Sequence, residues 1–241
     1  MKFRQFLINT FVAAVRLLRY NMKIIFANKF IYFLSGAVFI FIAVTAVNLF
    51  YIETTIDKET IYWTLLVPGI LIIFYPITFG IQNDSDNRML ELVFGIPNYR
   101  YKVQLLRVFL IFVIAFTVLF AFILFCNFII IPLTIFEMLY HIIFPILFLG
   151  STAFLISTFI KDGSGTAVIM IITIVVFWIA RDFFQSNPKW DIFLNPFSLP
   201  EGFSETVWDE IIIQNRIYLF VGSILAILYS LMNLQKRERL L

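Results

Sequence analysis

The residue types that carry out catalysis are sparse in this chain. His141 is the only histidine. Glu137 precedes it by one helical turn, so the two side chains could contact a cation or a polar substrate, or could simply be polar groups at a membrane interface. Cys126 is the single cysteine, which excludes an internal disulfide and a multi-cysteine metal site. We predict no metal site and no catalytic residue.

A phosphate-binding loop of the form G-x-x-x-x-G-K-[ST] is also missing from the sequence. The stretch from Lys161 to Thr166 has similar residues, but its lysine precedes the glycines and no strand leads into it. Glycine tolerates positive φ, so we interpret this stretch as a tight turn between two helices. The chain is therefore not expected to be an enzyme or to bind ATP by that route.

The composition points to a lipid environment. Hydrophobic residues make up 61% of the 241 residues, charged residues 14%, and phenylalanine alone occurs 31 times. A soluble domain is about half apolar and about a quarter charged. A water-exposed fold of this composition would carry large apolar patches. We expect an all-α, polytopic membrane protein.

Six apolar runs are long enough to be considered as transmembrane helices, because a bilayer needs about 20 apolar residues. They make up a single transmembrane domain of residues 1–241. The runs are 31–51, 61–81, 108–128, 139–160, 165–180 and 217–234, of which the fifth is short. Within this domain, residues 31–81 hold spans one and two, and residues 108–180 hold spans three to five. An inner loop, 82–107, separates these two parts. An outer loop, 181–216, precedes span six, 217–234, which is followed by a tail, 235–241.

Basic residues are distributed unequally between the predicted loops. With the N-terminus inside, 14 of the 18 lysines and arginines lie on the inner side, and 10 of the 15 acidic residues lie outside. Cytoplasmic loops are enriched in lysine and arginine. We therefore expect a multi-pass protein of the cell's inner (cytoplasmic) membrane with both termini in the cytoplasm.

Ionisable residues are nearly absent from the interior of these spans, although such residues usually mark functional sites in membranes. This argues against a proton relay or an intramembrane hydrolase. The other polar residues in the spans are uncharged. A translocation path lined by them suits an amphiphilic or apolar cargo better than a bare ion.

Two segments outside the spans are expected to lie at the membrane surface. Residues 1–29 have basic and polar residues on one helical face and apolar residues around the other, which is typical of an interfacial amphipathic helix. Residues 181–216 are rich in aromatic side chains, which favour the headgroup region. We expect this outer loop to help gate release, through Trp190, Phe193, Phe197 and Trp208.

The inner loop, 82–107, contains the most specific pattern. Asp86 or Ser85 can cap a short helix that begins near Asn87, and Gly95 followed by Pro97 can end it. Such a helix would lie on the cytoplasmic face as a separate rigid body, unless it only anchors the loop to the membrane. Its charged and apolar residues are Asp86, Arg88, Met89, Leu90, Glu91 and Phe94.

This segment resembles the loop between spans two and three of ABC exporter permeases of type 2, the ABC-2 membrane family. That family has an acidic residue before a Gly-Thr-Leu-Glu-Leu-Leu-like helix, followed by a small residue, a proline and a basic residue. Leu90-Glu91-Leu92-Val93 and Ile96-Pro97 match, whereas Arg88-Met89 replaces the Gly-Thr pair. The overall plan, with a basic first helix, six spans and a long aromatic outer loop, is also similar.

The resemblance implies a permease subunit of an ATP-binding cassette exporter. Residues 86–94 would then couple the spans to a separate nucleotide-binding ATPase subunit. That partner would bind ATP and magnesium, and this chain would hold no cofactor. A second permease copy or a homologous permease would complete the dimer in the lipid bilayer, and no nucleic acid is expected as a partner.

Two other classes of protein stay open. A non-transporting scaffold or assembly subunit of a larger membrane complex would share every feature except the coupling motif. An enzyme that acts on lipid is weaker, because the sequence has no convergent cluster of histidine, aspartate and glutamate.

Overall fold

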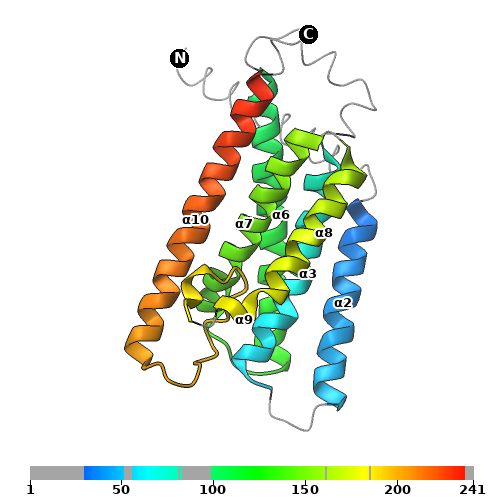
Figure 1. Cartoon of the computed structure of the whole chain (residues 1–241). Helices are drawn as coiled ribbons and strands as arrows, with labels where there is room; N and C mark the ends of the chain where they lie inside the picture. The colour runs from blue at the N-terminus through cyan, green and yellow to red at the C-terminus, as the bar shows by residue number, and fades with distance from the viewer. Residues whose placement is uncertain are drawn as a thin grey trace, which may run out of the picture.

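A computed structural model describes residues 30–51, 56–80, 82, 99–160, 162–184 and 186–236, and within these ranges the chain is a bundle of helices without strands (Figure 1). The predicted all-α membrane fold is confirmed. The predicted interfacial helix of residues 1–29 lies outside the described residues, as do all six predicted coupling residues between positions 86 and 94.

Five of the described helices are long and apolar enough to cross a bilayer. They are α2 (Phe30–Tyr51), α3 (Lys58–Thr78), α6 (Tyr99–Ile129), α7 (Ile135–Ile160) and α10 (Glu205–Lys236). A sixth apolar helix, α8 (Gly163–Ile179), has 17 residues. At 1.5 Å per residue it extends about 25 Å, slightly less than the ~30 Å hydrocarbon core. These helices follow the order of the six predicted runs.

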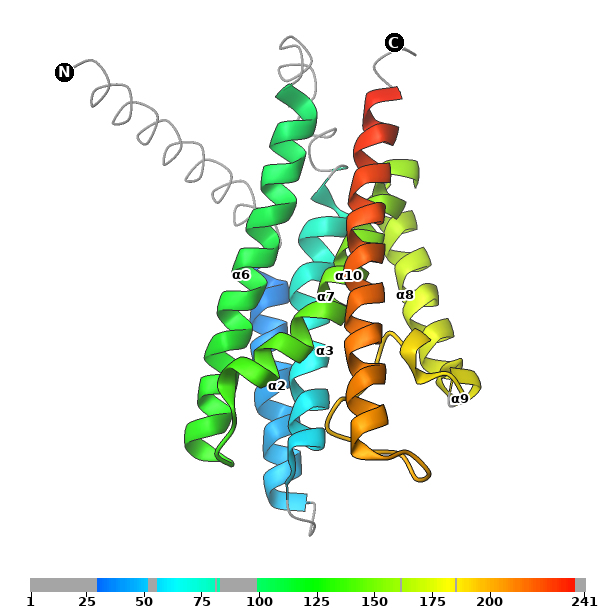
Figure 2. The ribbon, with the colours of Figure 1, turned by 90° about the vertical axis from the view of Figure 1, so that its left-hand side faces the viewer.

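Helix α7 lies at the centre of the bundle, where it packs against α3, α6, α8 and α10, while α2 packs on the far side of α3 (Figures 1 and 2). Burial follows this arrangement. In the most apolar part of α3, 67% of residues are buried inside the bundle, against 22% in α2 and 28% in α10. The exposed faces of α2 and α10 are apolar, so they suit contact with lipid.

Close packing between the central helices depends on glycine. A Cβ atom added at Gly150 of α7 would lie 2.7 Å from the ring of Phe112 on α6 and 3.1 Å from Ile73 on α3. A Cβ atom added at Gly69 of α3 would collide with the side chain of Ile146 on α7. Small residues of this kind let membrane helices approach closely.

The bundle has two distinct ends. Phe30 begins α2 and Lys236 ends α10 at one end, which we call the terminal end; residues 179–204 lie at the opposite loop end (Figure 1). The first and the last described helices therefore start and finish on the same side of the bundle.

The last helix is longer than the hydropathy pattern suggests. It begins at Glu205 rather than at position 217, so residues 205–216 of the predicted outer loop belong to α10. Trp208 and Ile212 are buried at helical spacing, while Asp209 and Glu210 occupy exposed positions between them. Those acidic residues lower the hydropathy of a segment that nevertheless has one packed helical face.

Candidate functional site

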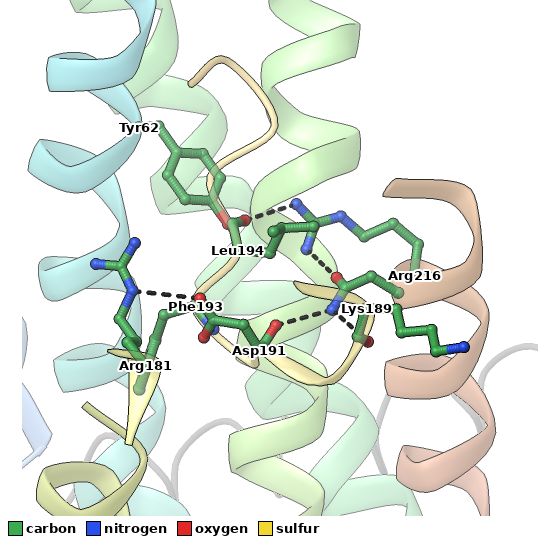
Figure 3. A network of polar contacts seen from close by, with 8 residues as sticks. Tyr62, Arg181, Lys189, Asp191, Phe193, Leu194 and Arg216 are labelled. Atoms are coloured by element: carbon green, nitrogen blue, oxygen red, sulfur yellow. Dashed lines mark hydrogen bonds and ion pairs between the residues drawn. The ribbon is translucent and has the colours of Figure 1, made fainter. Parts of the chain in front are cut away.

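A polar network fastens the loop end of the bundle to the segment between α8 and α10 (Figure 3). This segment contains the short helices α9 (Arg181–Phe184) and η1 (Pro188–Trp190). At its centre is the backbone carbonyl of Leu194. The hydroxyl of Tyr62 on α3 donates to this oxygen at 3.1 Å, and Nη2 of Arg216 on α10 donates to it at 3.1 Å.

A second set of bonds joins α10 to the segment. The amide Nδ2 of Asn215 donates to the carbonyls of Lys189 and Asp191 at 3.0 and 2.8 Å. Its Oδ1 accepts a bond from Nη1 of Arg216 at 2.9 Å. Two adjacent residues of α10 thus donate to three main-chain carbonyls of the segment, those of Lys189, Asp191 and Leu194.

Asp191 is the acidic member of the network. Its Oδ2 pairs with Nε of Arg181 at 3.2 Å, and its Oδ1 accepts a bond from the backbone N–H of Phe193 at 2.9 Å. Burial raises the pKa of Asp191, while the Phe193 N–H and the two nearby arginines, Arg181 and Arg216, act in the opposite direction. Because burial has the larger effect, the pairing only partly offsets the loss of solvent.

Further contacts complete the attachment. Nδ2 of Asn195 donates to the carbonyl of Glu59 at 3.2 Å, near the start of α3, and its Oδ1 accepts from Phe197 N at 3.0 Å. Nε1 of Trp208 donates to the carbonyl of Pro196 at 3.2 Å. The segment is therefore held by α3 on one side and by α10 on the other, as a cap over the loop end. We call residues 186–204 the outer cap.

Arg216 of α10 is the most unusual residue that contacts the cap. It exposes 1% of its surface and is the largest fully buried side chain of the described residues. Within the described ranges no carboxylate lies within ion-pair distance of it, and its Nε has no hydrogen-bond partner. A buried cation that is bonded only to neutral groups is costly, and in a membrane protein such a residue is a functional candidate.

The four predicted gate residues lie in different surroundings. Phe193 is buried edge-on to Trp178 of α8, and Trp208 is buried beside Phe203. Phe197 packs edge-on against Tyr62 and His141.

Trp190 differs from the other three, because 54% of its surface is exposed and its ring stacks on Tyr218 at 4.7 Å. The cap thus brings Trp190, Phe193 and Phe197 to different helices of the bundle, while Trp208 belongs to α10 itself and packs on the cap.

His141 and Glu137 also lie at the loop end, but no hydrogen bond or ion pair joins these two described residues. Glu137 forms an ion pair with Lys58 at 3.6 Å, whereas His141 lies between the rings of Tyr140 and Phe197. Among the described residues no group of three or more histidine, cysteine, aspartate or glutamate side chains could hold a metal ion.

At the terminal end, the described residues show how the ends of the inner loop are held. Oε1 of Gln82, which follows α3, accepts a bond from the backbone N–H of Gly163 at 2.7 Å, at the start of α8. Nη1 of Arg107 on α6 donates to the carbonyl of Gly80 at 3.3 Å. Asp162 caps α8 through Gly165 N at 2.6 Å. The turn predicted for residues 161–166 is shorter than expected, because α8 begins at Gly163 and neither Gly163 nor Gly165 has a positive φ.

The sequence reasoning missed Tyr62, Asp191, Asn215 and Arg216. Their bonds mostly reach main-chain carbonyls, which no residue type marks in a sequence. The run of three polar residues Gln214-Asn215-Arg216, between Ile211-Ile212-Ile213 and Ile217-Tyr218-Leu219, was the available signal.

Comparison of the chain with protein-family models, with curated proteins and with solved structures finds no match.

Proposed function

We propose that this chain is the transmembrane subunit of an ATP-binding cassette exporter of type 2. A separate nucleotide-binding subunit would bind ATP and magnesium and drive it, and a second permease copy or homologue would complete the path. The cargo would be amphiphilic or apolar. The helical membrane fold supports this reading, and the resemblance of residues 82–102 to a coupling loop gives it its specific content.

The observation that carries the proposal is the linkage between helices at the terminal end. Residues 83–98 connect α3 to α6. The chain just before them is bonded to α8 through Gln82 and Gly163, and to α6 through Gly80 and Arg107. A force applied to residues 83–98 would therefore reach three helices at once, α3, α6 and α8. An exporter that is driven by a separate ATPase requires this kind of connection.

The terminal end would face the cytoplasm of a cell's inner membrane. This orientation puts the basic residues of the inner loop on the side where lysine and arginine are enriched. It also puts the outer cap on the far side, above the loop end of the bundle. The cap's bonds to α3 and α10 then describe a closed state, and release of cargo would require the bonds at the Leu194 carbonyl to break.

Co-purification of the full chain from its native membranes tests the proposal. A soluble partner that hydrolyses ATP supports it, and Glu91→Ala or Arg88→Ala should reduce that association while membrane insertion stays normal. Asp209→Ala and Lys189→Ala, at the loop end, are the matched controls. A set of partners that are all membrane-embedded and hydrolyse no ATP would favour the scaffold subunit and overturn the proposal.

A further inference from the structure

A cavity of about 870 Å³ opens at the loop end, between the end of α8, α9, the outer cap and the first turns of α10. Ligand sites of small molecules are about 300–1,000 Å³, so the size fits a headgroup or a drug-sized molecule. Its apolar wall includes Trp178, Ile179, Phe184, Phe203 and Trp208. Its polar wall includes Arg181, Asp191, Asn195, Ser198 and Glu201.

The charged side chains that line this cavity are those of Arg181, Asp191 and Glu201. Arg181 and Asp191 line it as an ion pair, but the two side chains are not equally accessible: 35% of the arginine side chain is exposed, against 10% of the aspartate. A ligand that enters therefore meets the guanidinium. Arg216 is buried and is not part of the lining, but like Arg181 it acts to lower the pKa of Asp191.

The exposed guanidinium is held in a fixed orientation. The Cζ atom of Arg181 lies 4.7 Å from the ring centroid of Trp63 and 5.7 Å from that of Trp178. Stacking on an aromatic face leaves the edge of a guanidinium available for bonds in its plane, and that edge matches a carboxylate or a phosphate. Glu201 is the second acidic residue of the lining, and it is exposed.

The apolar wall continues onto the face that α8 presents to lipid. Ile179 lines the cavity and is 66% exposed, and Val175, Val176 and Ile172 on the preceding turns of α8 are also exposed. A molecule could therefore place a charged group against Arg181 while its apolar part lies along Trp178 and the outer surface of α8.

We propose that this cavity binds an anionic amphiphile, with its carboxylate or phosphate at Arg181 and its apolar part against Trp178, Phe203 and the lipid-facing side of α8. The molecule could be a phospholipid of the surrounding leaflet or a free amphiphile on its way out. The inference concerns binding alone, and it holds whether or not an ATPase drives the chain.

The test uses the purified full chain in nanodiscs of phosphatidylcholine, with dansyl-undecanoate as the anionic probe and dansyl-undecanol as its neutral counterpart. Energy transfer from tryptophan to dansyl reports binding. The acid should bind saturably and the alcohol should bind at least about tenfold more weakly, because a charge-assisted bond is lost. Repeating the titration in discs that contain phosphatidylglycerol separates the two sources: competition indicates a leaflet lipid, and unchanged binding indicates a free amphiphile.

Three variants locate the site. Arg181→Gln should weaken binding of the acid by about tenfold or more. Glu201 is exposed, so Glu201→Gln should leave the fold unchanged. It should strengthen binding of the acid by about twofold, because it removes a negative charge that repels the anionic probe. Lys189→Gln, a basic residue outside the lining, should change nothing. Equal binding of the acid and the alcohol would overturn the proposal. So would an affinity for the acid that stays unchanged in both Arg181→Gln and Glu201→Gln.

Discussion

Tyr62 of α3 and Arg216 of α10 bind the same atom, the carbonyl oxygen of Leu194, each at 3.1 Å. Two helices that are distant in sequence are thus joined through one main-chain group of the outer cap (Figure 3). Any movement that separates α3 from α10 at the loop end must break at least one of these bonds.

Tyr62→Phe removes one of the two bonds without changing the packing of the ring. We expect the free energy of unfolding to fall by about 0.5–1.5 kcal/mol, the usual net value of a hydrogen bond. Limited proteolysis should also cut residues 186–204 faster. Tyr218→Phe is the control, because the structure shows a ring contact but no hydrogen bond for that residue. Equal proteolysis of the two variants would show that the Leu194 bond does not hold the cap.

Two aspartates of the loop end should respond to pH in opposite directions. Burial raises the pKa of Asp191, so its contribution to stability is present below the unfolded pKa and is lost as the pH rises through the higher folded pKa. A backbone bond from Thr60 lowers the pKa of Asp57, so its contribution is present above the unfolded pKa and is lost as the pH falls through the lower folded value.

Denaturation midpoints measured between about pH 2 and 7 check this pair. Relative to Asp191→Asn, the wild type should lose stability as the pH rises. Relative to Asp57→Asn, the wild type should lose stability as the pH falls. Slopes of the same sign for both comparisons would mean that Asp191 is better paired than its contacts indicate.

Gly150→Ala should disturb the centre of the bundle. The new methyl group would meet the Phe112 ring at 2.7 Å, and that ring is buried and stacked on Phe116. A cost of about 1–3 kcal/mol is typical of overpacking. Gly36→Ala in α2 is the control, since its Cβ atom would find only an ordinary contact at 3.8 Å. Thermal unfolding in detergent measures both, and equal melting temperatures would contradict the packing described here.

The order of the helices could be predicted from the sequence, because a long apolar run in a lipid bilayer forms a helix that satisfies its own backbone hydrogen bonds. The start of α10 could not, because Asp209 and Glu210 interrupt the apolar pattern while Trp208 and Ile212 still pack on the cap. Arg216 was consequently placed at the end of a span, about three helical turns from where α10 begins.

The outer cap shows a similar limit. The aromatic residues of 181–216 predicted a segment packed at the membrane surface. Phe193 and Trp208 are buried, and the position of the segment relative to a membrane stays a prediction. Which atoms hold it could not be predicted, because Tyr62, Asn195 and Asn215 bind carbonyl oxygens that lie far away in sequence. The predicted roles of residues 86–94 stay predictions.

Gln82→Leu should separate coupling from folding. It removes the bond to Gly163 N and so releases α8 from the end of the inner loop. If force reaches α8 by this route, cargo-stimulated ATP hydrolysis of the purified complex should fall while ATPase association persists. Asn233→Leu removes bonds to Thr158 at the same end of the bundle, between α10 and α7, and serves as the control. Equal stimulation in both variants would exclude this route.

The most direct test of the proposed function is photo-crosslinking from position 91. A photoreactive amino acid replaces Glu91 in the full chain, cells are irradiated, and the crosslinked partner is identified by mass spectrometry. The same amino acid at position 209, at the opposite end of the bundle, is the control. The account predicts a nucleotide-binding ATPase crosslinked from position 91 and not from position 209. Crosslinks from position 91 only to lipid or to membrane-embedded proteins would contradict it.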